Sequence, residues 1–439
     1  MTRPLRILGA MFQGGGNVPL IMPIMARLVE QGHAVRVMAG PGVRRSRLPV
    51  NASLLGRIVA SGATVVPFQP PPSNPFDTAG HPRGLVGRWV PPGFESIPAE
   101  AQTAVWASAW AIAVAEELRA DPADVVVADF VLLGALAAAE GLNTPAVALM
   151  HTVAPWPVAG VPPYGPGWVP CTDTFRRTRD ALGRGLIEYL WRRNAREPLN
   201  HARAAVGLAP LQSPFSQYHS ASRVLMLASA TFDYPPRRLP ANVLHVGTPL
   251  GDAMSSGYRP EDAEDGRPLV LVSLSTLAQG QAPLLERIIL AMATVGARVL
   301  VTVGPALEPG DFQAPANVRL ERFIPHSEVL PYAAAMITQC GLGSVVRALA
   351  HGVPLLCLPL VGDQRENAAR VVARGAGLRL RSDARPRQIS AALRQLLTIP
   401  RFREAALAQA TALGNEPDGA MKATEEIEAA GRAGQRHSG

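Results

Sequence analysis

The sequence has 439 residues, of which 48% are hydrophobic and 17% are charged, and this is the composition of a folded globular protein. The length suits two or three domains of roughly 150 residues each. The net charge of +8 comes from basic residues that are all Arg except Lys422, scattered without a basic run, which argues against nucleic-acid binding. The three cysteines lack the spacing of a disulfide framework or a zinc site and indicate a reducing compartment.

The first half alternates strands and helices as a parallel sheet requires. A strand at 5–10 leads through glycines to a helix at 18–31, with Asn17 as N-cap and Gly32 as its stop. A strand at 34–39 completes a βαβ unit, which predicts a doubly wound sheet. The glycines lack the G-x-G-x-x-G spacing of an NAD site. Further strands are predicted at 64–68, 124–128, 145–149, 223–227 and 243–246, and helices at 100–119, 131–140 and 174–206.

Three loop features of this half bear on function. The Pro- and Gly-rich excursion at 69–99 is either a lid or acceptor-binding element or a disordered segment. Residues 141–172 carry no Asp, Glu, Lys or Arg, but their prolines exclude a membrane helix and predict an apolar loop. Asp129 and His151 each follow a strand, where open parallel sheets place their ligands.

Because Arg3 and Arg6 lead straight into the first strand, we expect no signal peptide and a cytoplasmic protein.

The second half repeats the alternation after a linker. Segment 251–267 concentrates Gly, Ser, Pro and acidic residues, so we place the linker at 249–267. The polar tail after Glu416 is expected to fray over its last nine residues. Strands are predicted at 269–273, 298–303, 317–321, 335–338 and 354–358, and helices at 282–295, 387–397 and 401–413.

The stretch from Met336 to Leu380 carries the strongest functional signal. A strand feeds a turn with Gly341, Gly343 and Ser344, and a helix follows. Unpaired first-turn N–H groups and the helix dipole make such a turn an anion site. A second strand and a helix that opens near Asp363 and Gln364 place a similar turn beside it. The pattern predicts an α/β protein with two doubly wound Rossmann-like domains that face a central cleft.

Residues 269–380 resemble the donor-binding half of the GT-B glycosyltransferases that use nucleotide-sugars to decorate small molecules such as antibiotics. The first half resembles them more loosely, at 14–35 and 125–152. The resemblance implies an acceptor domain at 1–248, a donor domain at 268–399 and helices at 400–439 that return to the first domain. The segments that carry it are VSLST (272–276), RFIPHSEVLP (322–331), TQCGLGSVVRALAHGVPLL (338–356) and GDQRENAARVVARGAGLRL (362–380).

The resemblance implies an inverting hexosyltransferase that moves a sugar from a dTDP- or UDP-sugar to a small aromatic or polyketide-like acceptor. No metal cofactor, nucleic acid or membrane insertion is expected, and a homodimer is compatible with the sequence. The alternative is a catalytically silent auxiliary or nucleotide-binding relative. The donor residues implied by the resemblance are Phe323 and Ile324 for the base, Ser275, Thr276, Gly341, Gly343 and Ser344 for the pyrophosphate, and Asp363 and Gln364 for the sugar.

Each of these assignments has a structural alternative. Asp363 and Gln364 have the carboxylate and amide that sugar hydroxyls need, but they are also common helix caps. The glycines could instead serve helix-strand packing. Trp156, Tyr164 and Trp168, in the apolar loop, are predicted to bind the acceptor, or else they cover the core.

Two residues depart from the family pattern. Gln339 and Asn17 stand where the family usually has histidines. Asparagine cannot act as a general base, so we expect His151, with Asp129, to take the proton while Asn17 positions the acceptor or sugar. Two alternatives stay open: His151 is a structural residue, or an already acidic acceptor needs no strong base.

Overall fold

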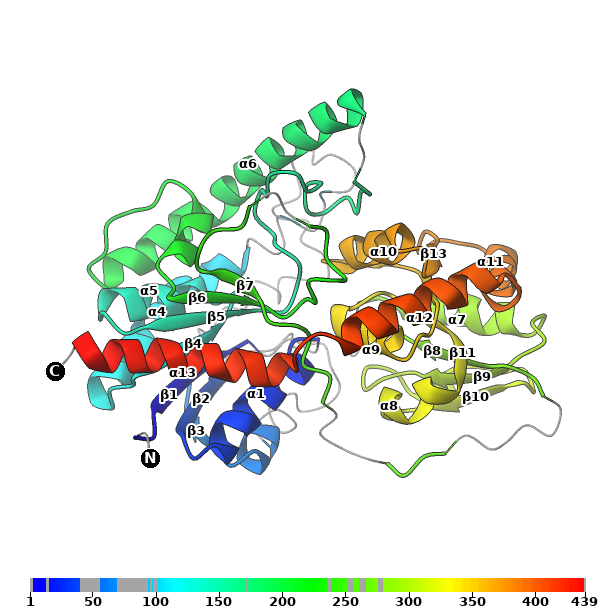
Figure 1. Cartoon of the computed structure of the whole chain (residues 1–439), viewed down its shortest axis with the longest axis horizontal. Helices are drawn as coiled ribbons and strands as arrows, with labels where there is room; N and C mark the ends of the chain where they lie inside the picture. Colours follow the sequence, from blue (N-terminus) through cyan, green and yellow to red (C-terminus); the bar gives the residue numbers. More distant parts are fainter. Residues whose placement is uncertain are drawn as a thin grey trace.

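Two α/β lobes lie side by side in the computed structural model of the chain (Figure 1). The predicted excursion at 69–99, apart from Phe94 and Ile97, and most of the predicted linker lie outside the residues that the structure describes. These described residues are 3–12, 16–39, 56–68, 94, 97, 102–170, 173–235, 238–251, 256–259, 266–274 and 279–437.

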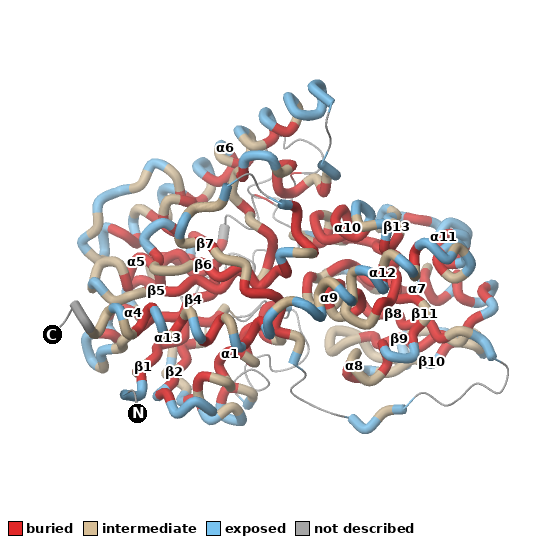
Figure 2. Tube along the Cα trace, in the orientation of Figure 1, coloured by how far each residue is buried: buried red, intermediate tan, exposed pale blue. Residues whose placement is uncertain are grey.

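The N-terminal lobe is built on a seven-stranded sheet in the order β3-β2-β1-β4-β5-β6-β7, with every pair parallel. Its central strands β1, β4, β5 and β6 are largely apolar and buried, as Figure 2 shows, because helices cover both faces of the sheet. The strands are β1 (Arg6–Met11), β2 (Ala34–Ala39), β3 (Thr64–Val66), β4 (Val125–Asp129), β5 (Ala146–Met150), β6 (Arg223–Met226) and β7 (Val243–His245). The helices are α1 (Val18–Glu30), η2 (Gln102–Trp106), α4 (Ala107–Ala120), α5 (Leu133–Gly141), α6 (Thr174–Ala205) and η3 (Pro214–His219).

The C-terminal lobe has a six-stranded parallel sheet in the order β10-β9-β8-β11-β12-β13. The prediction of two doubly wound α/β domains is therefore confirmed. The strands are β8 (Leu269–Ser273), β9 (Arg298–Thr302), β10 (Val318–Glu321), β11 (Ala333–Thr338), β12 (Leu355–Cys357) and β13 (Gly377–Arg379). The helices are α7 (Ala282–Met292), η4 (Pro309–Asp311), α8 (His326–Val329), η5 (Leu330–Tyr332), α9 (Leu342–Ala350), α10 (Gln364–Ala373), α11 (Pro386–Thr398) and α12 (Pro400–Gly414).

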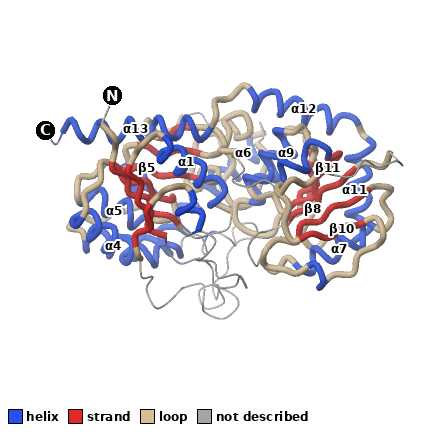
Figure 3. Tube along the Cα trace, turned by 90° about the horizontal axis from the view of Figure 1, so that it is seen from below, coloured by secondary structure: helices blue, strands red, loops and turns tan. Residues whose placement is uncertain are grey.

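The last helix, α13 (Gly419–His437), returns to the N-terminal lobe, whereas α12 stays on the C-terminal lobe (Figure 3). The expectation that the last nine residues fray was wrong for 431–437, because the helix continues through His437, and 438–439 lie outside the described residues. Its glycines allow close packing: a Cβ on Gly431 would lie 3.0 Å from Leu5 Cδ1, and one on Gly434 would lie 2.5 Å from Pro145 Cγ. Within the described part of the chain, no helix is long and apolar enough to cross a membrane.

A buried polar network joins the two lobes. Arg370 of α10 is 2% exposed, and its Nε and Nη2 each lie 2.7 Å from Asp233 Oδ1 in the N-terminal lobe. The guanidinium group also lies over the ring of Tyr234, with 4.2 Å between Cζ and the centroid. Asp233 Oδ2 lies 3.3 Å from His245 Nε2, and Arg374 Nη2 donates to the Asp233 carbonyl oxygen at 2.6 Å. Asp233 is thus the residue through which the N-terminal lobe joins this network.

Replacing Asp233 by asparagine should lower the free energy of unfolding at neutral pH by about 3 kcal/mol, because it removes one partner of a buried ion pair. Burial raises the pKa of Asp233, but Arg370 and His245 outweigh burial and bring it to about 2. A carboxyl group whose pKa is lowered by folding stabilises the protein above its unfolded pKa, and this stabilisation is lost as the pH falls toward the folded pKa. The Tm difference between wild type and variant should therefore shrink below about pH 4. Thermal unfolding of both proteins at a series of pH values checks this prediction. A Tm difference between wild type and variant that grows on acidification contradicts it.

Candidate active site

The turn between β11 and α9 has the structure of an anion site. Gly341 is the N-cap of α9, and because it has no side chain, no cap bond occupies the first-turn N–H groups. Gln339 is 7% exposed; its Oε1 accepts from the Thr338 hydroxyl at 3.1 Å, and its Nε2 lies 3.7 Å from where a Cβ on Gly341 would be. The amide therefore directs its N–H donors toward the glycine turn, which suits a diphosphate.

The turn that opens α10 lies against the first one. Asn367 donates to Cys340 O and to Asp363 Oδ2, both at 2.9 Å, and so ties the two turns together. Asp363 stands at the N-cap position of α10 but makes no side-chain cap bond, and its Oδ2 accepts from Asn367 instead. Asn367 was not predicted as a site residue, although it lies within the segment 362–380 that carries the resemblance.

The side chain of Gln364 makes hydrogen bonds inside the protein that the sequence did not predict. Its Oε1 accepts from Leu360 N at 2.8 Å and Val361 N at 3.0 Å, and its Nε2 donates to Gln279 Oε1 at 3.0 Å. The side chain is 5% exposed and holds the β12–α10 connection in shape. Its contact with a sugar stays a prediction.

Asn17, Asp129 and His151, far apart in the sequence, come together at the C-terminal edge of the first sheet. Asn17 Nδ2 donates to Asp129 Oδ2 at 2.5 Å and to Phe12 O at 2.6 Å, and the Asn17 side chain makes no cap bond to α1. His151 Nε2 lies 3.3 Å from Asp129 Oδ1, and the Phe130 ring and the imidazole form a T-shaped pair with 4.9 Å between centroids. Asp129, at 1% exposure, therefore binds Asn17 and is the charged partner of His151, although His151 Nε2 makes no hydrogen bond among the described residues.

The two lobes meet electrostatically at this point. Burial lowers the pKa of His151, but the Asp129 carboxylate and then Asp363 of the other lobe outweigh burial, so the net shift is upward. Burial raises the pKa of Asp363, and the opposing effects of Asn367, His151 and Thr152 are smaller. The carboxyl group expected to hold the sugar and the imidazole expected to take the proton are thus electrostatic neighbours across the two lobes.

The predicted acceptor aromatics occupy different environments. Trp156 packs on Tyr218, with 5.4 Å between ring centroids, and both line a cavity of about 580 Å³ in the N-terminal lobe. Tyr164 is 5% exposed, and Trp168 meets Phe94 edge-on at 6.0 Å. The Arg179 guanidinium lies 3.8 Å from the centroid of the Trp168 ring. Only Trp156 of the three lines this cavity, while Tyr164 and Trp168 pack in the manner of the core-covering alternative.

The two residues expected to bind the base lie in the turn after β10. Phe323 is 59% exposed, which leaves its ring available for stacking, and Ile324 is 5% exposed. Ser275 and Thr276 lie outside the described residues. The predicted turn at 341–344 is shorter in the structure, because Gly343 and Ser344 already belong to the first turn of α9. All the donor assignments remain predictions.

Comparison with known proteins decides the family. The 4'-demethylrebeccamycin synthase of Lentzea aerocolonigenes is 30% identical over 413 residues, which cover 91% of this chain and 93% of the relative. The chain belongs to the natural-product glycosyltransferases. Residues 286–427 of this glycosyltransferase match the family model described as erythromycin biosynthesis protein CIII-like, C-terminal domain.

Solved structures support the fold of the glycosyltransferase. The calicheamicin glycosyltransferase CalG4 superposes with a TM-score of 0.71 and 22% identity, covering 98% of each chain. The glycosyltransferase VinC, solved with dTDP, superposes with a TM-score of 0.70 and 21% identity over 98% of this chain and 100% of its own. The GT-B architecture and the enzyme class implied by the resemblance are therefore confirmed.

Proposed function

We propose that this glycosyltransferase moves a sugar, with inversion, from a dTDP- or UDP-sugar to a small aromatic or polyketide-like acceptor. The observation that carries the proposal is the meeting of the lobes at His151 and Asp363. There the imidazole that would take a proton lies 3.3 Å from the Asp129 carboxylate, and Asn367 ties the carboxyl group that would hold the sugar to the glycine turn. The carboxyl group of Asp363 raises the pKa of His151, and His151 lowers the pKa of Asp363. VinC was solved in complex with dTDP, which supports a nucleoside-diphosphate donor for this chain.

In the proposed reaction, an acceptor oxygen or nitrogen attacks the anomeric carbon from the face opposite the diphosphate. The bond from that carbon to the diphosphate oxygen breaks as the new glycosidic bond forms, and the acceptor proton passes to His151. The first-turn N–H groups of α9 and the amide of Gln339 stabilise the charge on the departing diphosphate. No step requires the histidine that Asn17 replaces.

Asn17 has a role that fits its contacts. Both contacts of its Nδ2 are inside the protein, with Asp129 and the Phe12 carbonyl, so it keeps the Asp129 carboxylate aligned beside His151. Its Oδ1 is buried and has no hydrogen-bond partner among the described residues. A buried acceptor atom of this kind is costly unless a ligand donates to it. We assign it to a hydroxyl or N–H group of the acceptor.

The test is a transfer assay with purified protein, dTDP- and UDP-sugars, and a panel of phenols, indoles and polyketide aglycones. The proposal predicts a glycosylated product whose anomeric configuration, read by NMR, is opposite to that of the donor. Retention of configuration contradicts the inverting step. Nucleotide binding without transfer or donor hydrolysis across the panel contradicts the whole proposal and favours an auxiliary protein.

A further inference from the structure

The loop that follows β5 is held by a carboxylate of the other lobe. Glu366 of α10 is 2% exposed, and its Oε1 accepts the main-chain N–H groups of Gly165 at 2.9 Å and Gly167 at 2.7 Å. Arg379, at the end of β13, donates from Nη1 to the Gly167 carbonyl oxygen at 2.7 Å. The C-terminal lobe therefore binds both the N–H and the C=O of the same loop residue.

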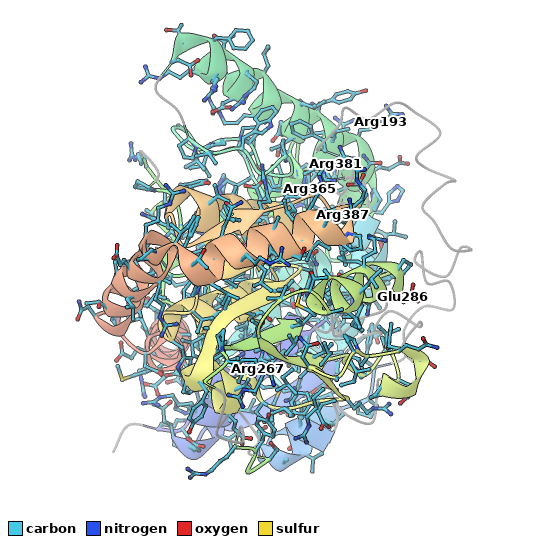
Figure 4. The ribbon with its side chains drawn as sticks, turned by 90° about the vertical axis from the view of Figure 1, so that its right-hand side faces the viewer. Arg193, Arg267, Glu286, Arg365, Arg381 and Arg387 are labelled. Atoms are coloured by element: carbon cyan, nitrogen blue, oxygen red, sulfur yellow. The ribbon has the colours of Figure 1, made fainter. Side chains whose placement is uncertain are left out.

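The loop also lies directly on the backbone of α10. Gly167 has φ +63°, and a Cβ added there would lie 2.3 Å from the carbonyl oxygen of Arg365. No other residue fits without moving the loop or the helix. Figure 4 shows Arg365 on the same side of the C-terminal lobe as Arg381. The fit at Gly167 and the bonds to Glu366 together fix the distance between loop and helix.

Glu366 is itself held in place. Its Oε2 lies 3.2 Å from Arg370 Nη1, and Arg370 binds Asp233 of the N-terminal lobe. Burial raises the pKa of Glu366, while Arg370 and the two glycine N–H groups act in the opposite direction. The carboxyl group has a hydrogen-bond partner at each oxygen, so its position is determined by α10 and the network around it.

Glu366 lies three residues after Asp363, and residues at this spacing share one side of a helix. Any shift of α10 therefore moves both the carboxyl group assigned to the sugar and the carboxylate that holds the loop. The loop in question begins directly after His151 and includes Trp156.

We infer that Glu366 is a positioning residue for sugar transfer, which holds the acceptor loop at Gly165 and Gly167 in register with Asp363 on the same helix. This inference rests on the proposed function, because it takes the loop at 152–170 to be an acceptor element. Loosening the loop should leave donor binding intact but let water compete with the acceptor for the anomeric carbon. A displacement of about 1 Å can cost on the order of 100-fold in rate.

The experiment compares the ratio of transfer to donor hydrolysis in Glu366→Leu, Glu366→Gln and Arg379→Gln. We expect Glu366→Leu to lower the ratio at least about tenfold while donor KM stays within about twofold. Glu366→Gln should lower the ratio of transfer to hydrolysis less than Glu366→Leu does, because its amide oxygen can still accept both N–H groups. Asp383→Asn is the matched control, because Asp383 forms an exposed ion pair with Arg381 within the same lobe, with side chains 67% and 87% exposed.

Arg379 is exposed, so Arg379→Gln tests the same loop contact if Glu366→Leu does not fold. The inference is overturned if the variants fold, remain active and have a lower Tm, but keep the wild-type ratio of transfer to donor hydrolysis. Glu366 would then be a purely structural residue. Absence of any transfer by the wild-type enzyme contradicts the proposed function itself, together with this inference.

Discussion

Replacing His151 by alanine should reduce kcat/KM for transfer by about 10²- to 10⁴-fold, the usual contribution of a general base. Donor KM should change little, because the imidazole belongs to the N-terminal lobe. Asp129→Asn should also lower the rate, since Asp129 is the charged partner of the imidazole and raises its pKa. The measurement is steady-state transfer with one donor and acceptor pair, and wild-type rates in both variants contradict the assignment.

The pH profile gives an independent check of the same base. A base must be neutral to accept a proton, and the net pKa shift of His151 is upward. Activity should therefore rise with pH through a value above the ordinary histidine pKa of about 6.5. Asn17→Ala should keep this rise but lower the rate less than His151→Ala, because Asn17 only aligns Asp129 and the acceptor. An acceptor that is already acidic would instead give a profile that follows the acceptor's own pKa.

Replacing Asp363 by asparagine should lower kcat/KM for the nucleotide-sugar by about 10- to 100-fold, because a hydrogen bond to a charged group contributes about 1.5 to 3 kcal/mol. The affinity for dTDP or UDP alone should stay unchanged, since these ligands have no sugar for the carboxyl group to hold. The measurement pairs donor kinetics with nucleotide titration. Asparagine caps a helix as well as aspartate does, so a purely structural Asp363 would show no loss.

The same variant should also affect His151. Asp363 is one of the carboxyl groups that raise the pKa of His151, so its loss should move the acidic limb of the pH profile to lower pH. The proposed arrangement is contradicted if the acidic limb moves to higher pH. It is also contradicted if the affinity for dTDP or UDP alone falls as much as kcat/KM for the nucleotide-sugar.

Much of the fold could be predicted because the buried strands are short apolar runs bounded by turn residues. The predicted strands at 34–39 and 269–273 match β2 and β8 residue for residue. The convergence of Asp129 and His151 followed from the rule that parallel sheets place ligands at the carboxyl ends of their strands. The glycine turn at Gly341 was recognisable for a similar reason, since strand, turn and helix start are all local features.

Other features depend on contacts between distant segments and carry no local signal. Glu366 binds residues about 200 positions earlier in the chain, and nothing in its own segment indicates that partner. Gly431 and Gly434 weaken a helix by propensity, but packing against Leu5 and Pro145 outweighs that preference in α13. The side chain of Asn17 is suited to an N-cap by sequence, yet in the folded protein its amide donates to Asp129, which lies on a neighbouring strand of the sheet.

The most direct test of the central claim is a calorimetric titration of the protein with dTDP and UDP, repeated on Gly341→Val. The backbone at Gly341 has φ −60°, which valine adopts without strain, so the substitution fills the turn without distorting it. We predict one-to-one binding to the wild type and an affinity at least about tenfold weaker in the variant. Failure of both nucleotides to bind the wild type, or equal binding by the variant, would contradict the claim that the glycine turn of α9 holds the diphosphate.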